Sequence, residues 1–541
     1  MKKMSKKAVS LFLCAVMILT ALPLMGTTAF AENYVSGDFE YRVLEDGTAE
    51  IAGYTGNATE VEIPSKLSKY TVTSIGGWAQ WNESLRNVKI PDSVKNIGDY
   101  AFTECKSLPS VNLPDSVTSM GNGVFQNCIA LASVTLPKNI TSIGNDVFNG
   151  CSSLTSITIP DNVISLGDNA FRNCTNLESI TIPGNVTTLG WSVFEGCTGL
   201  ESVTISDSVT TIGRGTFKGC ISLESVIIPD SVVRLESAVF EDCTGLESVT
   251  LSNKITDLGE YTFYNCESLK SITIPDSVTS IDWHAFENCI SLTSVTLPNK
   301  LTEISASLFY NCESLTSIEI PDRVTSIGEY AFANCDSLTG VTLSDKLTGI
   351  GGNAFYNCES LKNIIIPDRV THIDWNAFEN CISLTSITIP DKVTEISVSA
   401  FNNCSNLSDI YILNKDCNIY EPYYDDEYTI PAHTTIHGYI GSTSEDYAAK
   451  WGNEFVELTE DDIPTPETPQ VIGDISGDGK LSAVDAKWIL QSIAQTRDFD
   501  EAQTKSADLN GDGKISVVDV KWVLQIIAGM RDAETLEPIK K

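Results

Sequence analysis

The chain has 541 residues, enough for several domains, and its 71 Asp and Glu residues against 35 Lys and Arg give a formal net charge of −36. This acidity argues against nucleic acid as a partner, because phosphates attract basic surfaces. Solubility is the ordinary interpretation of such acidity, and cation binding has to be argued from clustered carboxylates.

The N-terminus has the features of an export signal. Four lysines among the first seven residues precede the apolar run "AVSLFLCAVMILTALPLM", and "AFA" precedes Glu32. A basic start, a short apolar run and small residues at the end are typical of a secretory signal peptide, so we predict that residues 1–31 are removed. The short run disfavours the alternative, a retained anchor. No later segment is apolar enough to span a bilayer, so we expect a secreted, extracellular protein.

A 23-residue phrase fills the middle of the chain. Cysteines recur with a constant spacing of 23 from Cys105 to Cys404, each followed by Leu, by branched aliphatics and usually by Pro. The residue twenty positions after each Cys is always Phe, from Phe125 to Phe401. A fixed period of this length is typical of a solenoid. One coil cannot enclose its own apolar residues, whereas coils stacked about 4.8 Å apart bury them in continuous columns.

Each coil is predicted to contain two short strands and a turn. In "SITIP" the Ile residues alternate with Ser and Thr, so the strand buries one face and exposes the other until Pro ends it. The next aliphatics, as in "VTSI", favour a second short strand, and "AFxNC" favours a tight helical turn. Fourteen coils would make a rod or arc of about 65 Å.

Both ends of the stack need covering. Residues 37–54 alternate apolar and polar residues around Asp46-Gly47, which predicts a hairpin, so residues 32–104 are interpreted as an N-terminal cap with the first repeats. Regular repeats follow over residues 105–404. Residues 405–458 are interpreted as the C-terminal cap, in which "STSEDYAAKWG" predicts a short helix.

The phrase "LxSIxIPDSVTSIGxxAFxNC" and its period resemble the BspA-type leucine-rich repeat family over residues 37–458. The resemblance implies a leucine-rich repeat solenoid of short parallel strands and short helical turns. It also implies a secreted or surface-displayed protein that binds other macromolecules, because some members are adhesins. It does not name the ligand.

The column of cysteines has several interpretations. A disulfide ladder is the alternative in an oxidising compartment, but neighbouring Cys residues with parallel Cβ directions match disulfide geometry poorly. We predict buried free thiols that act as small apolar fillers. A single column of Cys lacks converging metal ligands, and fourteen copies of one structural position cannot all be nucleophiles.

Surface residues also recur at fixed places in the coils. Trp191, Trp283 and Trp375 occupy the same position in their coils, and each is four coils from the next. They are interpreted either as stacking platforms for a polysaccharide or protein, or as the product of block duplication, which the near-repeat of the surrounding sequence favours. Columns of Ser and Thr on the exposed strand face fit an ordinary solvated strand better than an ice-binding array.

Residues 459–470, "TEDDIPTPETPQ", predict an extended linker before a tail of residues 471–541. Two twelve-residue loops in this tail have oxygen donors at positions one, three, five, nine and twelve and Gly at six, which is the arrangement that Ca²⁺ prefers. The predicted ligands of two Ca²⁺ ions are Asp474, Ser476, Asp478, the Lys480 carbonyl, Ser482, Asp485, Asp508, Asn510, Asp512, the Lys514 carbonyl, Ser516 and Asp519. Ser476 replaces the usual Asn or Asp, so the first site is expected to be the weaker.

A helix is predicted only after each loop, because "PTPETPQVIG" before the first loop cannot form one. Two loop-then-helix half EF-hands with Asp at position twelve resemble the all-α type I dockerin family over residues 472–532. The resemblance implies docking to a cohesin of a scaffoldin in a cellulosome-type assembly. By this resemblance the positions facing the cohesin are Ala483, Val484, Lys487, Leu490, Gln491, Val517, Val518, Lys521, Leu524 and Gln525.

The first tail helix carries more apolar surface than a sixty-residue, two-helix core can cover, which itself indicates a partner. The duplicated halves permit binding in two orientations, which is a hypothesis.

Catalysis has little support in the sequence. HExxH, GxSxG and P-loop motifs are absent, and no stretch is left for a catalytic domain. We therefore predict a non-catalytic binding protein whose solenoid recognises a protein or glycan and whose tail docks it to a scaffoldin. The alternatives are a cell-surface adhesin or structural spacer fixed by its tail, or a carbohydrate-active enzyme that uses carboxylates of neighbouring coils.

Overall fold

The computed structural model describes residues 33–79, 82–421 and 428–459, and beyond these 486, 487, 489, 490, 493, 507, 515, 516, 520, 521, 523 and 524. The chain forms two compact units, residues 1–457 and residues 458–541. The predicted signal peptide and all but the first residue of the predicted linker lie outside the described residues.

The N-terminal unit begins with the predicted hairpin. Strands β2 and β3 pair antiparallel around a turn in which the Gly47 amide donates to the Leu44 carbonyl, 3.0 Å away. Strand β3 then pairs parallel with β6, which joins the hairpin to the first coil. The strands of this end are β1 (Tyr34–Ser36), β2 (Phe39–Val43), β3 (Ala49–Tyr54), β4 (Glu60–Glu62), β5 (Lys66–Leu67) and β6 (Tyr70–Ile75).

The first strand of a coil pairs parallel and in register with its counterpart one coil away, and in the coil that begins at Cys151 residues 156–158 form no strand at this place. In β22, Ile272 is buried between exposed Ser271 and Thr273, which confirms the predicted alternation. The strands of this column are β7 (Asn87–Lys89), β9 (Ser110–Asn112), β11 (Ser133–Thr135), β14 (Ser179–Thr181), β16 (Ser202–Thr204), β18 (Ser225–Ile227), β20 (Ser248–Thr250), β22 (Ser271–Thr273), β24 (Ser294–Thr296), β25 (Ser317–Glu319), β27 (Gly340–Thr342), β29 (Asn363–Ile364), β31 (Ser386–Ile389) and β33 (Asp409–Ile412).

The second strands are two residues long and form a second parallel column with a buried apolar residue at the same place in each, and in one coil the strand is reduced to a single bridge between Ile304 and Ile327. Between its first and second strands each coil makes a turn, which follows the residue that is Pro in most coils. The strands of the second column are β8 (Asn96–Ile97), β10 (Ser119–Met120), β12 (Ser142–Ile143), β13 (Ser165–Leu166), β15 (Thr188–Leu189), β17 (Thr211–Ile212), β19 (Arg234–Leu235), β21 (Asp257–Leu258), β23 (Ser280–Ile281), β26 (Ser326–Ile327), β28 (Gly349–Ile350), β30 (His372–Ile373), β32 (Glu395–Ile396) and β34 (Asn418–Ile419).

The segment that closes each coil is a series of reverse turns, where the sequence predicts a tight helical turn. Two residues of this segment have left-handed backbone in every coil from Cys105 to Cys404. They lie five positions and one position before the recurring Cys, as Tyr261 (φ 58°) and Asn265 (φ 57°) illustrate. A left-handed residue at such close intervals interrupts the helical dihedral angles. Backbone amides of the segment instead donate to the following coil, as the Phe102 amide does to the Val124 carbonyl, 2.9 Å away.

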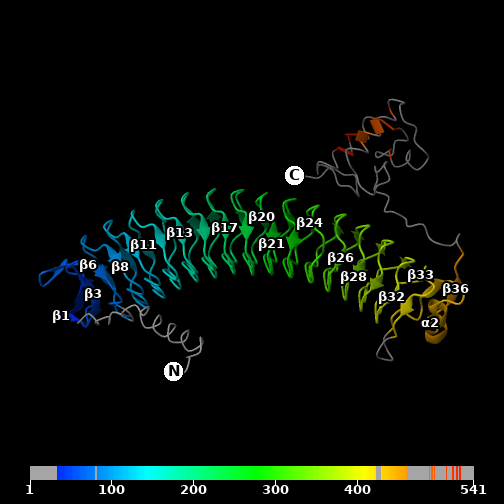
Figure 1. Ribbon diagram of the computed structural model, residues 1–541, viewed down its shortest axis with the longest axis horizontal. Coiled ribbons are helices and arrows are strands. Elements are labelled where there is room, and N and C mark those ends of the chain that lie inside the picture. Colours follow the sequence, from blue (N-terminus) through cyan, green and yellow to red (C-terminus); the bar gives the residue numbers. More distant parts are fainter. Residues whose placement is uncertain are drawn as a thin grey trace, which may run out of the picture. The chain divides into compact units, whose positions relative to one another are not determined.

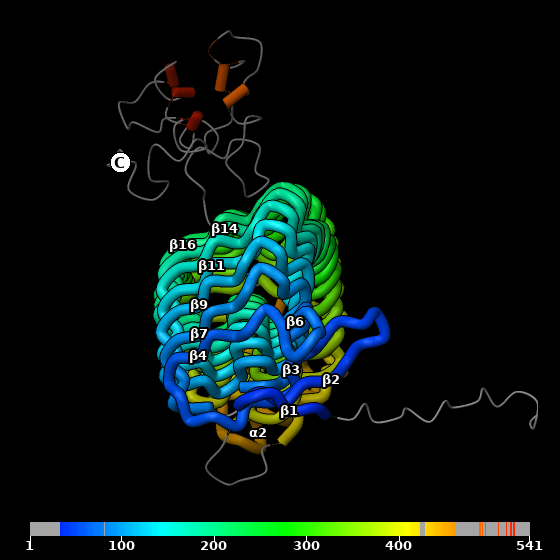
Figure 2. Tube along the Cα trace, turned by 90° about the vertical axis from the view of Figure 1, so that its left-hand side faces the viewer, coloured from blue at the N-terminus to red at the C-terminus, as the bar shows by residue number. Residues whose placement is uncertain are grey.

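The core is a set of continuous columns, and the phenylalanines form the largest of them. From Phe102 to Phe401 each ring stacks on the next, with centroids 5.3–5.6 Å apart and planes within 14° of parallel. Figure 1 shows these coils following one another along an arc, and Figure 2 shows them nested behind one another when viewed toward its N-terminal end.

The C-terminal end of the stack is closed by the predicted helix, α2 (Thr443–Trp451). Ser442 caps its N-terminus by accepting from the Glu445 amide, and Gly452, with φ of 83°, ends it. Strands β35 (Thr435–Gly438) and β36 (Phe455–Glu457) continue the first column beyond β33. The helix contacts both of them and β34.

Candidate interaction surfaces

The three tryptophans at the shared coil position have two different settings. Trp191 and Trp283 are each 60% exposed, whereas Trp375 is half-buried. Trp375 lies over Gly352 of the preceding coil, where an added Cβ would come within 2.5 Å of the indole. The Tyr330 ring meets this indole edge-on, with centroids 5.9 Å apart. Two of the three tryptophans therefore expose most of their surface, and the third packs against an aromatic neighbour.

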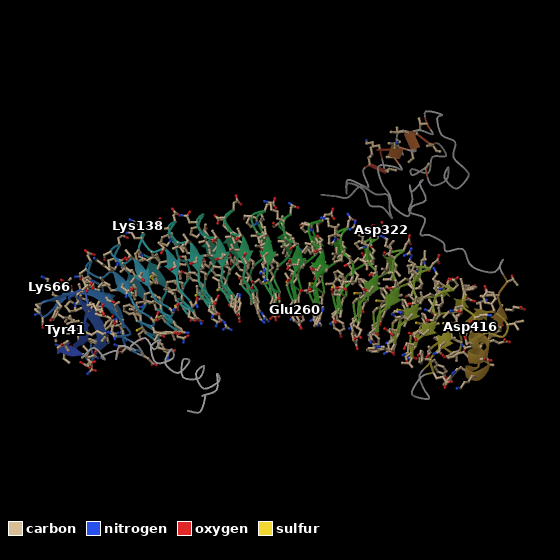
Figure 3. All side chains as sticks on the ribbon, viewed as in Figure 1. Tyr41, Lys66, Lys138, Glu260, Asp322 and Asp416 are labelled. Atoms are coloured by element: carbon tan, nitrogen blue, oxygen red, sulfur yellow. The ribbon has the colours of Figure 1, made fainter. Side chains whose placement is uncertain are left out.

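Six successive closing segments carry that cluster, and we call them the aromatic edge. The aromatic edge consists of residues 259–264, 282–287, 305–310, 328–333, 351–356 and 374–379. Within it the Tyr261 and His284 rings are stacked, with centroids 5.0 Å apart and planes 3° from parallel, and Tyr264 meets Tyr261 edge-on at 5.5 Å. Figure 3 shows Glu260, in the first of these segments, at the inner edge of the arc, and Lys138 and Asp322 at the outer edge.

The aromatic edge is acidic. It contains no Lys or Arg, and its carboxylates are Glu260, Asp282, Glu287, Glu329, Asp374 and Glu379. His284 Nδ1 pairs with the Glu287 carboxylate. Burial, together with the nearby carboxylates of Glu260, Asp257 and Glu303, raises the pKa of Asp282. The aromatic edge therefore combines aromatic side chains with negatively charged hydrogen-bond acceptors.

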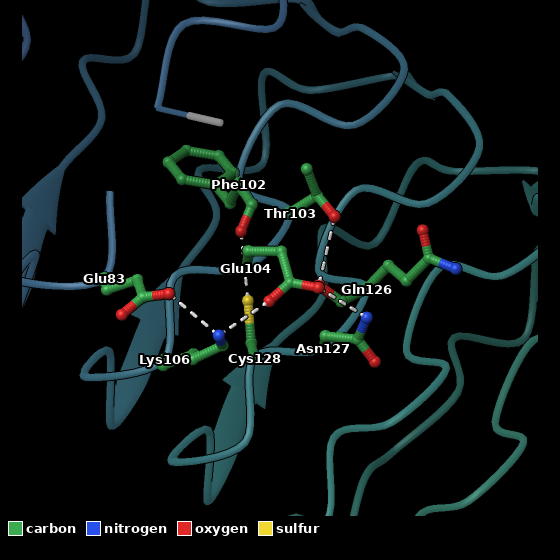
Figure 4. Close-up of polar contacts among 8 residues, drawn as sticks. All are labelled: Glu83, Phe102, Thr103, Glu104, Lys106, Gln126, Asn127 and Cys128. Atoms are coloured by element: carbon green, nitrogen blue, oxygen red, sulfur yellow. Dashed lines mark hydrogen bonds and ion pairs between the residues drawn. The ribbon is translucent and has the colours of Figure 1, made fainter. Parts of the chain in front are cut away.

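The thiols of the cysteine column, Cys105 to Cys404, are buried, form no disulfides and donate hydrogen bonds. Each of the fourteen Sγ atoms lies 3.0–3.3 Å from a backbone carbonyl oxygen 26 residues earlier. Figure 4 shows one such pair, Cys128 and Phe102. Burial raises the pKa of Cys105, Cys243 and Cys404 to about 12. The thiols are thus donors as well as the predicted apolar fillers, and they are unsuited to nucleophilic chemistry.

The side-chain amides of successive Asn residues form a hydrogen-bonded ladder beside the thiols, which was not predicted from the sequence. From Asn288 to Asn380 each Nδ2 donates to the Oδ1 of the Asn one coil earlier, at 2.7–2.9 Å. These Asn residues have left-handed backbone, which Asn tolerates better than most residues. The recurring dipeptide Asn-Cys is the signal that could have revealed the ladder.

A polar cluster at the C-terminal end resembles a catalytic arrangement only in composition. His437 Nε2 lies 2.8 Å from Asp409 Oδ1, and the Ser408 hydroxyl donates to the other oxygen of the same carboxylate, 2.6 Å away. Ser408 and His437 therefore do not form a nucleophile and base pair. The Tyr411 ring stacks on His437 with centroids 4.2 Å apart, so the cluster joins the last strands of the sheet.

Most of the described residues of the tail fall in two helical stretches, residues 486, 487, 489, 490 and 493 and residues 520, 521, 523 and 524, which repeat with a period of 34. Ala486 and Ile489 are buried in the first, as are Val520 and Val523 in the second. Of the predicted cohesin-facing residues, the structure describes four and leaves them exposed, with Leu490 at 47% and Leu524 at 49%. The exposed residues of this set are Lys487, Leu490, Lys521 and Leu524.

The remaining predicted cohesin-facing residues and all predicted calcium ligands except Ser516 lie outside the described residues, and Ser516 itself is half-buried. Among the residues that the structure describes, no group of three or more His, Cys, Asp or Glu side chains is arranged to hold a metal ion. No described helix combines the length and hydrophobicity needed to cross a membrane.

Comparison with known proteins identifies both parts of the chain. Residues 73–201, 192–315 and 302–430 match the BspA type leucine rich repeat region, and residues 472–528 match the dockerin type I domain. No curated relative matches the chain.

Solved structures of bacterial leucine-rich repeat proteins are similar to the N-terminal unit. A leucine-rich repeat protein of Bacteroides ovatus shares 30% identity, with a TM-score of 0.62, over 79% of this chain and 100% of that one. A leucine rich cell surface protein of Faecalibacterium prausnitzii also shares 30% identity, over 62% and 94%, with a TM-score of 0.42. The chain therefore belongs to the BspA-type leucine-rich repeat family and carries a C-terminal type I dockerin domain.

Proposed function

We propose that this chain is an exported, non-catalytic binding protein whose dockerin docks it, in the presence of Ca²⁺, to a cohesin of a cellulosome-type scaffoldin while the solenoid holds a macromolecule. The observation that carries the docking is the matched exposure of Leu490 and Leu524. Each directly follows a buried apolar residue, Ile489 or Val523, and a large apolar side chain kept in solvent at both equivalent positions fits an interface with a partner.

Calcium fits the donor set of both loops. Each loop offers carboxylate, hydroxyl or amide oxygens and a backbone carbonyl, and no soft sulfur or imidazole ligand, which suits a hard cation such as Ca²⁺. The bound ion supplies the charge that holds the acidic loops together. The residues that would hold it are Asp474, Asp478 and Asp485 with Ser476, Ser482 and the Lys480 carbonyl, and their counterparts from Asp508 to Asp519.

The binding role of the solenoid is supported by its architecture. A column of coils presents one continuous edge to solvent, and such extended surfaces are what solenoids use for recognition. The proposed non-catalytic role is supported by the thiols, which are buried donors, and by the polar cluster at Asp409, in which the Ser408 hydroxyl bonds to the carboxylate and not to the imidazole. Export is supported by the basic and apolar N-terminus.

Capture by immobilised cohesins tests the docking. The full chain without residues 1–31 is passed over a panel of cohesins with CaCl₂ and again with EGTA. We expect capture by at least one cohesin with calcium and release by the chelator. The variant Asp474→Ala/Asp508→Ala is expected to lose capture while the solenoid keeps its melting temperature. Capture that is indifferent to EGTA, or no capture by the panel, would contradict the proposal.

A further inference from the structure

The aromatic edge is confined to one part of the solenoid. Besides the buried Phe column, it carries Tyr261, Tyr264, Trp283, His284, Tyr310, Tyr330, Tyr356 and Trp375 in six coils. The seven preceding coils have only Tyr100 and Trp191 in the same segments. Those coils form the same turns and the same Phe stack with small, polar or charged residues at the other equivalent places. The fold therefore does not require the aromatic residues.

Block duplication does not explain the cluster either. It accounts for the pair Asp282-Trp283 and Asp374-Trp375, but Tyr310 and Tyr330 lie between the two blocks and have partners of their own. The Tyr310 and Tyr330 rings are 6.3 Å apart, and Tyr330 in turn meets Trp375. Residues from three coils thus build one corner of the surface.

The neighbouring charges restrict what this surface can bind. The absence of Lys and Arg and the presence of six carboxylates disfavour any polyanion, whether a nucleic acid or an acidic polysaccharide. Protein interfaces are typically enriched in aromatic residues, Arg and Met and depleted in Asp and Glu at their centres, so six carboxylates without Arg disfavour a protein partner although the aromatic residues alone would suit one. Trp283 is the one large hydrophobic residue of the aromatic edge with more than a third of its surface exposed, so aliphatic anchors for a protein partner are missing as well.

We infer that the aromatic edge binds a chain of neutral polysaccharide, which deepens the binding role proposed for the solenoid and rests on it. Aromatic faces stack on the C–H faces of pyranose rings, and carboxylates accept hydrogen bonds from sugar hydroxyls. Trp283 and Trp375 stand four coils apart, about 19 Å, so one extended glycan chain can reach both. The Tyr330 corner lies between them, and the stacked Tyr261 and His284 pair adds aromatic surface at the Trp283 end.

The carboxylates have a defined place in this surface. Glu260 directly precedes Tyr261 and Asp282 directly precedes Trp283 in the chain, so each of these two aromatic residues has an acceptor as its sequence neighbour. The pairing of His284 with Glu287 holds the imidazole that stacks on Tyr261. An ordered ring beside fixed acceptors lowers the entropy lost when a sugar binds.

Affinity electrophoresis of the full chain without residues 1–31 tests the inference. The gels contain hydroxyethylcellulose, xyloglucan or galactomannan as neutral polysaccharides, and polygalacturonate as the polyanion. We expect at least one neutral polysaccharide to retard the protein and polygalacturonate to leave it unretarded. Trp283→Ala is expected to weaken binding about tenfold and Trp283→Ala/Trp375→Ala to abolish the retardation.

Trp191→Ala is the matched control, because Trp191 has the same place in its coil and the same exposure but lies outside the aromatic edge. It should bind as the unchanged chain does, and the melting temperatures of all variants should agree. No retardation by the three neutral polysaccharides overturns the inference, as does equal weakening by Trp191→Ala or retardation by polygalacturonate alone. Cohesin capture is measured on the same variants and is unaffected by these outcomes, so failure of docking and failure of glycan binding are separable.

Discussion

The thiol of Cys128 donates to the carbonyl oxygen of Phe102, 3.1 Å away, and so joins the cysteine column to the backbone of the phenylalanine column. The same bond recurs between every pair of neighbouring coils up to Cys404 and Phe378. The Phe102 carbonyl also accepts from the Cys105 amide, 3.2 Å away, so the thiol is the second donor to this buried oxygen. The cysteine is thus suited to its place because it is small, apolar enough for the core and still a donor.

Burial of these thiols predicts a steep alkaline limit of stability. The pKa of Cys105, Cys243 and Cys404 is raised from 9.0 to about 12 in the folded protein. Their contribution is fully present below pH 9 and is lost as the pH rises toward 12, by about 1.4 kcal/mol per thiol and pH unit. The guanidinium midpoint should therefore fall sharply above pH 9. Native protein at pH 8 should resist iodoacetamide, and a midpoint unchanged up to pH 11 would contradict this account.

The amide ladder predicts an order of stability at Asn311. Its Nδ2 donates to Asn288 and its Oδ1 accepts from Asn334, and its backbone is left-handed with φ of 60°. Asn311→Gly loses the side-chain bonds and should cost about 1 kcal/mol. Asn311→Ala also strains the backbone and should cost about 2–3 kcal/mol in the free energy of unfolding. Urea denaturation measures both, and an alanine variant as stable as the glycine variant would refute the backbone argument.

The repeated helices of the dockerin predict redundancy in docking. If the two halves serve in alternate orientations, Leu490→Glu and Leu524→Glu should each leave cohesin capture intact, because the other half remains available. The double variant should weaken capture about a hundredfold or more, as loss of central apolar contacts does. Surface plasmon resonance on an immobilised cohesin measures this. Loss of binding in either single variant would show that only one orientation is used.

The cluster at the C-terminal end predicts a modest acid dependence. A hydrogen bond from Ser408 and the pairing with His437 lower the pKa of Asp409 below its usual value. The stability that this carboxylate contributes is present above pH 4 and is lost as the pH falls through its depressed pKa. Asp409→Asn should make the melting temperature less dependent on pH between 3 and 5, by an amount worth less than about 1 kcal/mol. An unchanged profile would contradict the role of this pair.

Much of the fold could be predicted because the same residue types recur at fixed spacing. The period of 23 places Phe240 and Phe263 in one column, and the alternation around Ile272 identifies the buried face of its strand. The helix that begins after Ser442 and ends before Gly452 has capping residues that are legible in the sequence. In each case a local pattern and the demand for burial favour the same structure.

The rest depends on contacts between coils that spacing alone does not reveal. Ala238 has left-handed backbone, with φ of 60°, although Ala has no preference for it, because the stack imposes the turn. Trp375 lies down on its neighbours because Gly352, 23 residues earlier, leaves room for the indole. The thiol bonds likewise depend on the direction of a carbonyl in the preceding coil. The exposed leucines of the dockerin were predicted through resemblance to a family, and their exposure agrees with that role.

The direction of the closing turns has a consequence for how such a protein can grow. The amides of Tyr100 and Phe102 donate forward to the next coil, and this continues until the Phe401 amide donates to Thr429 of the C-terminal cap. The backbone bonds at every junction between coils are therefore interchangeable, while the two ends are not. Insertion or deletion of whole 23-residue units between the ends would keep these backbone bonds matched, so a gene can lengthen or shorten the ligand-contacting edge in fixed increments without redesigning either terminus.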